Sequence, residues 1–128
     1  MGWRDWFGSK DPAGTSARPL EHCVTIHLDL SEATPYGTHE ERDAVHRLSD
    51  RLADAIAIHA AGEFDDDEFG DGKCVLYMYG PDANRLFEAI APALKDQRRF
   101  VNGRIVRRFG PPGSRTEEND LASLRQPS

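Results

Sequence analysis

The chain lacks the features that mark most secreted and membrane proteins. Its 128 residues include only two cysteines, Cys23 and Cys74, which are too few for a disulfide framework. No stretch approaches the roughly 20 apolar residues that a membrane span needs, and the first residues do not combine a basic start with an apolar run, as a secretory signal does. We therefore expect no transmembrane segment, two small buried thiols and a reducing, cytoplasmic setting, most simply in a bacterium.

Signatures of the common enzyme and cofactor sites are also missing. The sequence has no G-x-S-x-G elbow, no H-E-x-x-H zinc motif, no P-loop and no dinucleotide-binding glycine fingerprint. His22, His39, His46 and His59 do not stand at metal-ligand spacing. We therefore expect no cofactor, and a non-catalytic protein is favoured over an enzyme.

The first half of the chain contains a strand and a long helix. Residues 22–30 alternate apolar and polar side chains, the pattern of a half-buried strand. Thr38 and Glu41 then form a capping box, which signals the start of a helix. Apolar residues recur at steps of three and four after it, so we expect an amphipathic helix of about six turns that ends at Gly62.

The second half repeats this pattern with a hairpin in front. A Gly-Asp-Gly turn at residues 70–72 separates two short strands and predicts a β-hairpin. Pro81 suits the first position of a second helix, which Pro92 should kink or end because it removes a backbone donor. Residues 104–110 follow a turn and form the last strand.

The resulting order of elements, β-α-β-β-α-β, predicts an α+β protein with a ferredoxin-like split fold. Right-handed crossovers would place both helices on one face of a four-stranded antiparallel sheet of order 4-1-3-2. We assign this domain to residues 21–110. Residues 1–20 form an N-terminal tail with a short Trp-containing turn, and residues 111–128 form a polar tail that we expect to be disordered.

The acidic stretch GEFDDDEFGDG at residues 62–72 admits two interpretations, a metal site or a protected sheet edge. Asp65 and Asp67 fit ligand positions of a calcium loop, but Phe69 and Leu76 occupy two others. Phe64 and Phe69 are five apart, so the strand either bulges among the aspartates or ends before Phe69. Charge and a bulge both protect an edge strand from pairing. We favour the interpretation as a protected sheet edge. If a cation binds instead, Asp65 and Asp67 are the candidate ligands.

Basic residues cluster on the last strand, which the 4-1-3-2 order places at the edge opposite the acidic strand. Arg104, Arg107 and Arg108 are the candidates there for binding phosphates or an acidic partner, since the planar guanidinium fork suits both. The alternative is a solvated edge with its own protective charges. The net charge of −6 disfavours indiscriminate binding to nucleic acid.

The sheet face without helices is the other candidate surface. Alternation places His27 and Asp29 of the first strand and Tyr77 and Tyr79 of the third on this face. Tyrosine supplies rigid contact area in protein interfaces, so we favour a protein partner or self-association as a homodimer. His27 and Asp29, about 7 Å apart on one strand, are the acid/base candidates if the protein is an enzyme.

The same topology resembles that of RNA-recognition motifs, which stack bases on aromatic residues of the two central strands. Their third-strand signature matches KCVLYMYG at Lys73 and Tyr77 and loosely at Met78, while Cys74 and Leu76 stand at the glycine-type positions. The resemblance implies a binder of single-stranded nucleic acid, which we keep as an alternative.

The N-terminal tail holds a possible anchor. Trp3, Trp6 and Phe7 fall on one side of a single helical turn, so we expect this turn to dock on its own domain or on a partner. Taken together, the sequence favours a small regulatory or protein-interaction module, and it names no partner.

Overall fold

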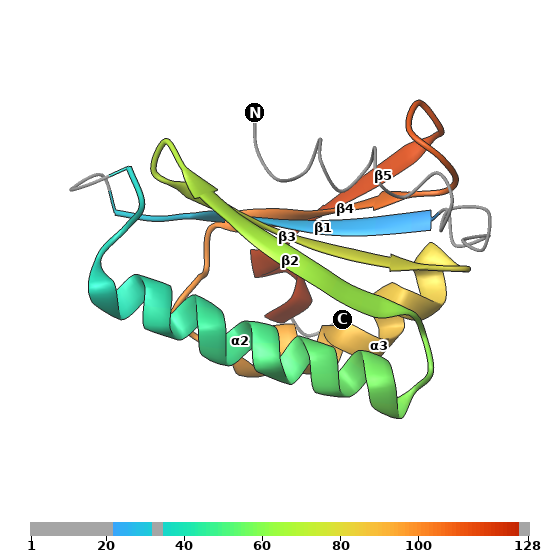
Figure 1. Ribbon diagram of the computed structural model, residues 1–128, viewed down its shortest axis with the longest axis horizontal. Coiled ribbons are helices and arrows are strands. Elements are labelled where there is room, and N and C mark those ends of the chain that lie inside the picture. Colours follow the sequence, from blue (N-terminus) through green and yellow to red (C-terminus); the bar gives the residue numbers. More distant parts are fainter. Residues whose placement is uncertain (1–21, 32–34, 126–128) are drawn as a thin grey trace.

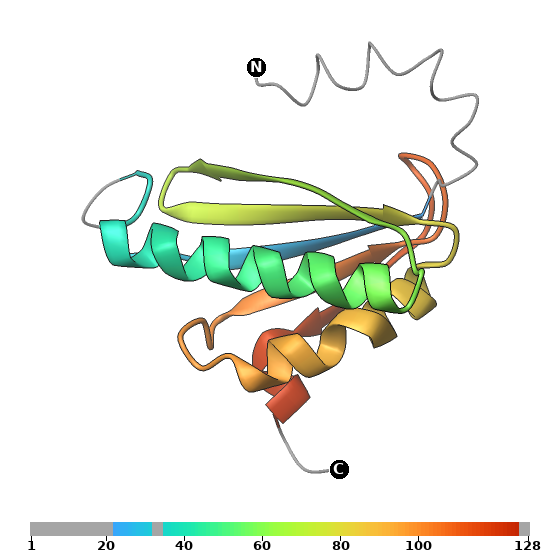
Figure 2. The same ribbon diagram turned by 60° about the horizontal axis from the view of Figure 1, so that its bottom comes forward.

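The computed structural model, which describes residues 22–31 and 35–125, is an α+β protein with an antiparallel sheet of five strands. The sheet has the order β2-β3-β1-β4-β5, and both helices lie against the same face of it (Figures 1 and 2). The elements are β1 (His22–Asp29), α2 (His39–Ile58), β2 (Glu63–Gly70), β3 (Lys73–Gly80), α3 (Ala83–Asp96), β4 (Gly103–Arg108), β5 (Thr116–Asp120) and the 3-10 helix η1 (Leu121–Arg125).

The C-terminal segment corrects three predictions. Residues 116–125, assigned from the sequence to a disordered tail, form β5 and η1, so the sheet has five strands and not four. β5 pairs antiparallel with β4, with Arg104 opposite Asp120 and Arg108 opposite Thr116. β4 is therefore an inner strand and not an edge, and the two edges of the sheet are β2 and β5.

The capping box predicted at the start of α2 is present. The Thr38 hydroxyl accepts a hydrogen bond from the Glu41 amide at 3.1 Å, and the Glu41 carboxylate accepts one from the Thr38 amide at 2.8 Å. The second Glu41 oxygen accepts a bond from the Ser31 amide at 2.8 Å, which ties the end of β1 to the start of the helix. The helix ends at Ile58, before the predicted Gly62.

The second helix continues through its proline. Asp82 caps α3 by accepting a hydrogen bond from the Asn84 amide at 2.9 Å. Pro92 was expected to kink or end the helix, and it does not end it, because α3 runs on to Asp96. The carbonyl that loses its donor belongs to Glu88, and both Glu88 and Pro92 are exposed. Water can therefore satisfy this carbonyl, which lowers the cost of the proline.

The β2–β3 hairpin has the bulge that the two phenylalanines implied. The pairing of β2 with β3 shifts between Phe64 and Asp66, so Phe64 and Phe69 both pack against the core. Asp71 and Gly72 form the turn with φ values of 54° and 73°. Two successive positive φ values are typical of the type I′ turn that suits two-residue hairpins.

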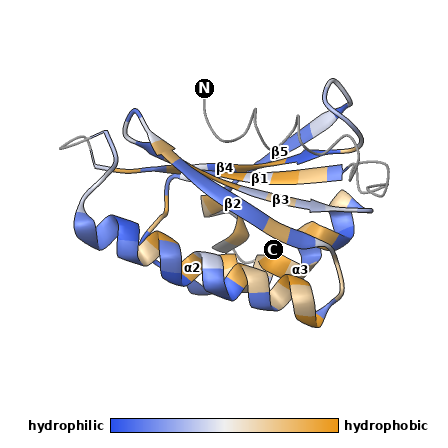
Figure 3. Cartoon of the chain, viewed as in Figure 1, coloured by the Kyte–Doolittle hydropathy of each residue, from blue (hydrophilic) through white to orange (hydrophobic). Residues whose placement is uncertain are grey.

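The core lies between the sheet and the helices. β1 carries hydrophobic segments in Figure 3, whereas β5 and the first turns of α2 are hydrophilic. The largest fully buried side chains come from both layers: Ile26, Leu28, Leu52, Ile56, Leu76, Met78, Leu86, Ile90, Leu94 and Ile105. Among residues 22–31 and 35–125, no helix lies on the opposite side of the sheet, which we call the open face.

Both cysteines are buried, as predicted, and they are not joined by a disulfide. Cys23 pairs across the strands with Tyr79, while Cys74 pairs with Leu28, so the two thiols lie at opposite ends of the β1–β3 ladder. That separation, about 17 Å along the strands, is too large for a disulfide. Burial raises the pKa of the Cys74 thiol to about 12, which leaves it protonated and unreactive at neutral pH.

Candidate functional site

The strand register aligns the side chains of the open face into rows that cross the sheet. One row is Asp66, Tyr77, Thr25, Val106 and Glu118. The next row is Glu68, Val75, His27, Arg104 and Asp120. Each row begins on β2 and ends on β5 with a carboxylate. The open face therefore has an aromatic centre, flanked on β4 by Arg104 and Arg108, between two acidic edges.

The tyrosines lie on this face where the sequence pattern predicted them. The Tyr77 hydroxyl donates a hydrogen bond to the Glu68 carboxylate at 2.9 Å, which links β3 to the acidic edge. Tyr79 lies in a neighbouring row beside Cys23, and beyond it Arg108. Both rings are half-buried, so each keeps an accessible edge that can contact another molecule.

His27 and Asp29 share the open face but have different partners. The His27 Nε2 atom lies 3.0 Å from the Thr25 hydroxyl, and the Asp29 carboxylate accepts a hydrogen bond from Lys73 at 3.2 Å. Burial lowers the pKa of His27, and the positive charge of Arg104 lowers it further. The imidazole is therefore neutral at neutral pH, and its bonded partner is a hydroxyl and not the carboxylate of an acid/base pair.

The three arginines of β4 do not share one surface. Arg104 and Arg108 belong to the open face, where Arg104 lies 3.6 Å from Glu118 of β5 and Arg108 donates to the Gly110 carbonyl at 2.7 Å. Arg107 alternates with them and points to the helices. The sequence already indicated this direction of the Arg107 side chain. Arg107 stands two residues after the core residue Ile105 and so shares its side of the strand.

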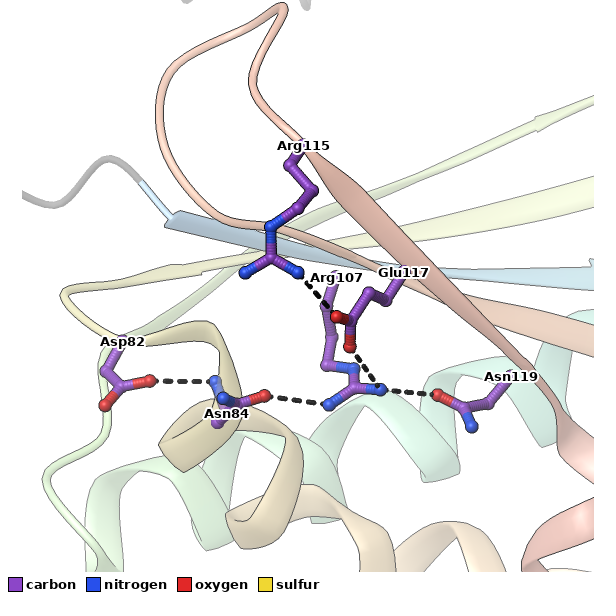
Figure 4. Close-up of polar contacts among 6 residues, drawn as sticks. All are labelled: Asp82, Asn84, Arg107, Arg115, Glu117 and Asn119. Carbon is purple, nitrogen blue, oxygen red and sulfur yellow. Dashed lines mark hydrogen bonds and ion pairs between the residues drawn. The ribbon is translucent and has the colours of Figure 1, made fainter.

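Arg107 joins three elements on the covered side of the sheet (Figure 4). Its guanidinium donates to the Asn84 side chain of α3 at 2.8 Å and to the Asn119 side chain of β5 at 2.9 Å. Glu117 lies 3.3 Å from it, and the Phe87 ring centroid lies 4.8 Å away. Only 16% of the Arg107 side chain is exposed. This geometry makes Arg107 a structural cross-link between α3, β4 and β5.

The two aspartates considered as metal ligands lie at and beside the bulge. Asp65 occupies the register shift, while Asp67 pairs with Leu76 and so points to the helices. Burial raises the pKa of Asp67, the Asp66 charge adds to this, and His46 opposes it. Among residues 22–31 and 35–125, no group of three or more His, Cys, Asp or Glu side chains is placed to hold a metal ion.

Some contributors to the open face were missed in the sequence. Glu118 and Asp120 belong to β5, whose residues TEEND show no apolar alternation. Val106 was not predicted to be part of this face, because the arginines around it led us to interpret the strand as a basic edge. The predicted anchor residues Trp3 and Trp6 lie outside the part of the chain that the structure describes.

Comparisons with known proteins identified no relative of this chain. No protein-family model matches the chain, and neither curated proteins nor solved structures provide a match. In the described ranges, neither helix combines the length and the apolar character that crossing a membrane requires. Any functional argument therefore depends on the geometry of the described residues.

Proposed function

We propose that this chain is a non-catalytic protein-interaction module whose binding surface is the open face. One observation carries the proposal, the aromatic centre between two acidic edges. Half-buried tyrosines supply contact area at a small entropic cost, and the carboxylates on β2 and β5 favour a partner that presents lysine or arginine around an apolar patch. The partner we infer is a protein surface of that kind.

The same charges weigh against other occupants. Two copies of the chain stacked through their open faces would bring acidic edges close together, and like charges at an interface cost free energy. Phosphates of a nucleic acid would meet the same repulsion. The separate partners of His27 and Asp29 weigh against the enzymatic alternative.

We also infer that the elements from β1 to β4 form a ferredoxin-like core, with β5 added beside it. The chain order of these elements and the adjacency of β4, β1, β3 and β2 support this assignment. Such a core leaves one sheet face uncovered, as the proposed function requires. The two buried thiols, which are not joined by a disulfide, support a reducing, cytoplasmic compartment.

Site-specific photo-crosslinking tests the proposed surface. A benzophenone side chain replaces Val75 or Val106 on the open face, with Ile58 of α2, which is 77% exposed, as the matched control position. We expect positions 75 and 106 to crosslink the same protein in cells of the source organism, and position 58 not to do so.

The identified partner is then purified and titrated with the intact chain. We expect Val106→Asp to weaken binding by about tenfold or more, because it places a charge at the centre of the face, and Ile58→Asp to leave affinity within about twofold. Affinity should fall with added salt. Equal effects of the two variants, or crosslinks between two copies of the chain, would contradict the proposal.

A further inference from the structure

A cavity of about 270 Å³ lies on the helical side of the molecule, between the middle turns of α2 and the segment that follows α3. Its charged lining consists of Arg47, Arg51, Arg98 and Arg99, and Leu48 and Phe100 contribute apolar wall. We call it the arginine pocket. None of its arginines belongs to the open face, so the pocket is separate from the proposed protein-binding surface.

Local structure holds these arginines in place. Arg47 and Arg51 are four residues apart and therefore lie on the same side of α2. After α3, the Gln97 side chain donates to the Phe100 carbonyl at 2.7 Å and accepts from the Phe100 amide at 2.9 Å. This closed loop, anchored by the buried Phe100, carries Arg98 and Arg99 between its two ends.

The pocket holds more positive charge than its surroundings neutralise. Arg51 pairs with Asp96 at 2.9 Å. Within the described ranges, the side chains of Arg47, Arg98 and Arg99 have no hydrogen bond or ion pair, whereas the Arg107 guanidinium donates to Asn84 and Asn119. In a protein with a net charge of −6, like-charged guanidinium groups around one cavity point to an anionic ligand.

We propose that the arginine pocket binds a small molecule that carries a diphosphate or triphosphate group, such as a nucleoside triphosphate. Guanidinium groups recognise phosphate oxygens through paired, charge-assisted hydrogen bonds. Several such groups match the charge of a polyphosphate better than that of a single phosphate. The cavity volume accommodates a diphosphate and part of its substituent, and Leu48 and Phe100 offer that substituent apolar contact.

Calorimetric titration of the full chain tests this proposal, with ATP, pyrophosphate and orthophosphate as probes in magnesium-free buffer of about 50 mM salt. We expect ATP and pyrophosphate to bind at one site per chain and orthophosphate to bind about tenfold more weakly or worse. Arg47→Gln and Arg98→Gln should each weaken ATP binding about tenfold, because each removes a charged donor.

Matched variants separate the site from general charge effects. Arg85→Gln removes the same charge from an exposed position in the first turn of α3, outside the pocket, and should change ATP affinity less than about twofold. Arg47→Lys keeps the charge but not the fork and should lie between the wild type and Arg47→Gln. Thermal melting checks that each variant is folded.

Three results would overturn the proposal. The first is no ATP binding at about 1 mM ligand. The second is equal weakening by Arg85→Gln and Arg98→Gln, which would mean unspecific attraction. The third is an RNA oligonucleotide that binds through Arg98 and is not displaced by ATP, since the occupant would then be a nucleic acid.

Discussion

Charged side chains have different surroundings on the two faces of the sheet, and two arginines of β4 within four residues of each other show the difference. Arg107, on the covered face, has hydrogen-bonding partners from α3 and β5 and a nearby aromatic ring. Arg104, on the open face, has an exposed carboxylate 3.6 Å away. A charge between sheet and helices has lost water and needs protein partners in its place, whereas water still solvates one on the open face.

β2 shows the same contrast with the opposite sign of charge. Asp67 points to the helices, and burial raises its pKa. Glu68, the next residue, is on the open face and accepts a hydrogen bond from Tyr77. Asp67 is thus a partly desolvated charge with weaker compensation than Arg107 receives. The covered face therefore contains one charge that stabilises the fold and one that weakens it.

Arg107→Met gives the largest expected effect. The substitution leaves the side-chain oxygens of Asn84 and Asn119 without their donor and uncouples α3 from β5. We expect the free energy of unfolding in urea to fall by about 3 kcal/mol. Arg104→Met on the open face is the matched control, with an expected change within about 0.5 kcal/mol. A similar loss of unfolding free energy in the two variants would contradict the proposed difference between the two faces.

Asp67→Asn should act in the opposite direction. The folded state raises the pKa of this carboxyl above its usual 3.8, so folding disfavours its charged form, and stability falls as pH rises through that window. At about pH 7 the variant should be more stable by roughly 0.5 kcal/mol, a gain limited by solvent screening. At about pH 3 the gain should vanish, because both states then hold a neutral carboxyl. A destabilised variant at neutral pH would show that the Asp67 charge is compensated.

The smallest expected effect concerns His27. Its folded-state pKa is lowered from 6.5, first by burial and then by Arg104, while Glu118 opposes the shift. The unfolded chain therefore takes up the proton first as pH falls, and stability should decline below about pH 6.5. We expect a loss of a few tenths of a kcal/mol by about pH 5.5 that His27→Gln removes. Urea titrations of both proteins at several pH values measure it, and identical pH profiles would refute the assignment.

The sequence was most informative where local chemistry decides the structure. The capping box of Thr38 and Glu41 defined the start of α2, and the spacing of Phe64 and Phe69 indicated the bulge. Alternation assigned Tyr77, Tyr79 and His27 to the open face. Each of these features depends on residues close together in the chain, so periodicity and turn chemistry suffice to reveal them.

Features that depend on distant residues were not foreseen. β5 has a polar sequence with low strand propensity, and it forms beside β4, where Glu117 and Glu118 meet Arg107 and Arg104. The arginine pocket combines α2 with a segment almost 50 residues later, so only packing brings its charges together. Pro92 is tolerated because its position in α3 is exposed, which depends on how the helix packs.

Because β5 follows β4 in the chain, their pairing has a consequence for synthesis. A ribosome adds about 5–20 residues per second, so β4 leaves it before the strand that will pair with it. During that interval one side of β4 presents free backbone groups, and the guanidinium of Arg107 has not yet met Asn119. Nascent chains are thus exposed for a short time to strand exchange with their neighbours, and completion of the last hairpin ends that exposure.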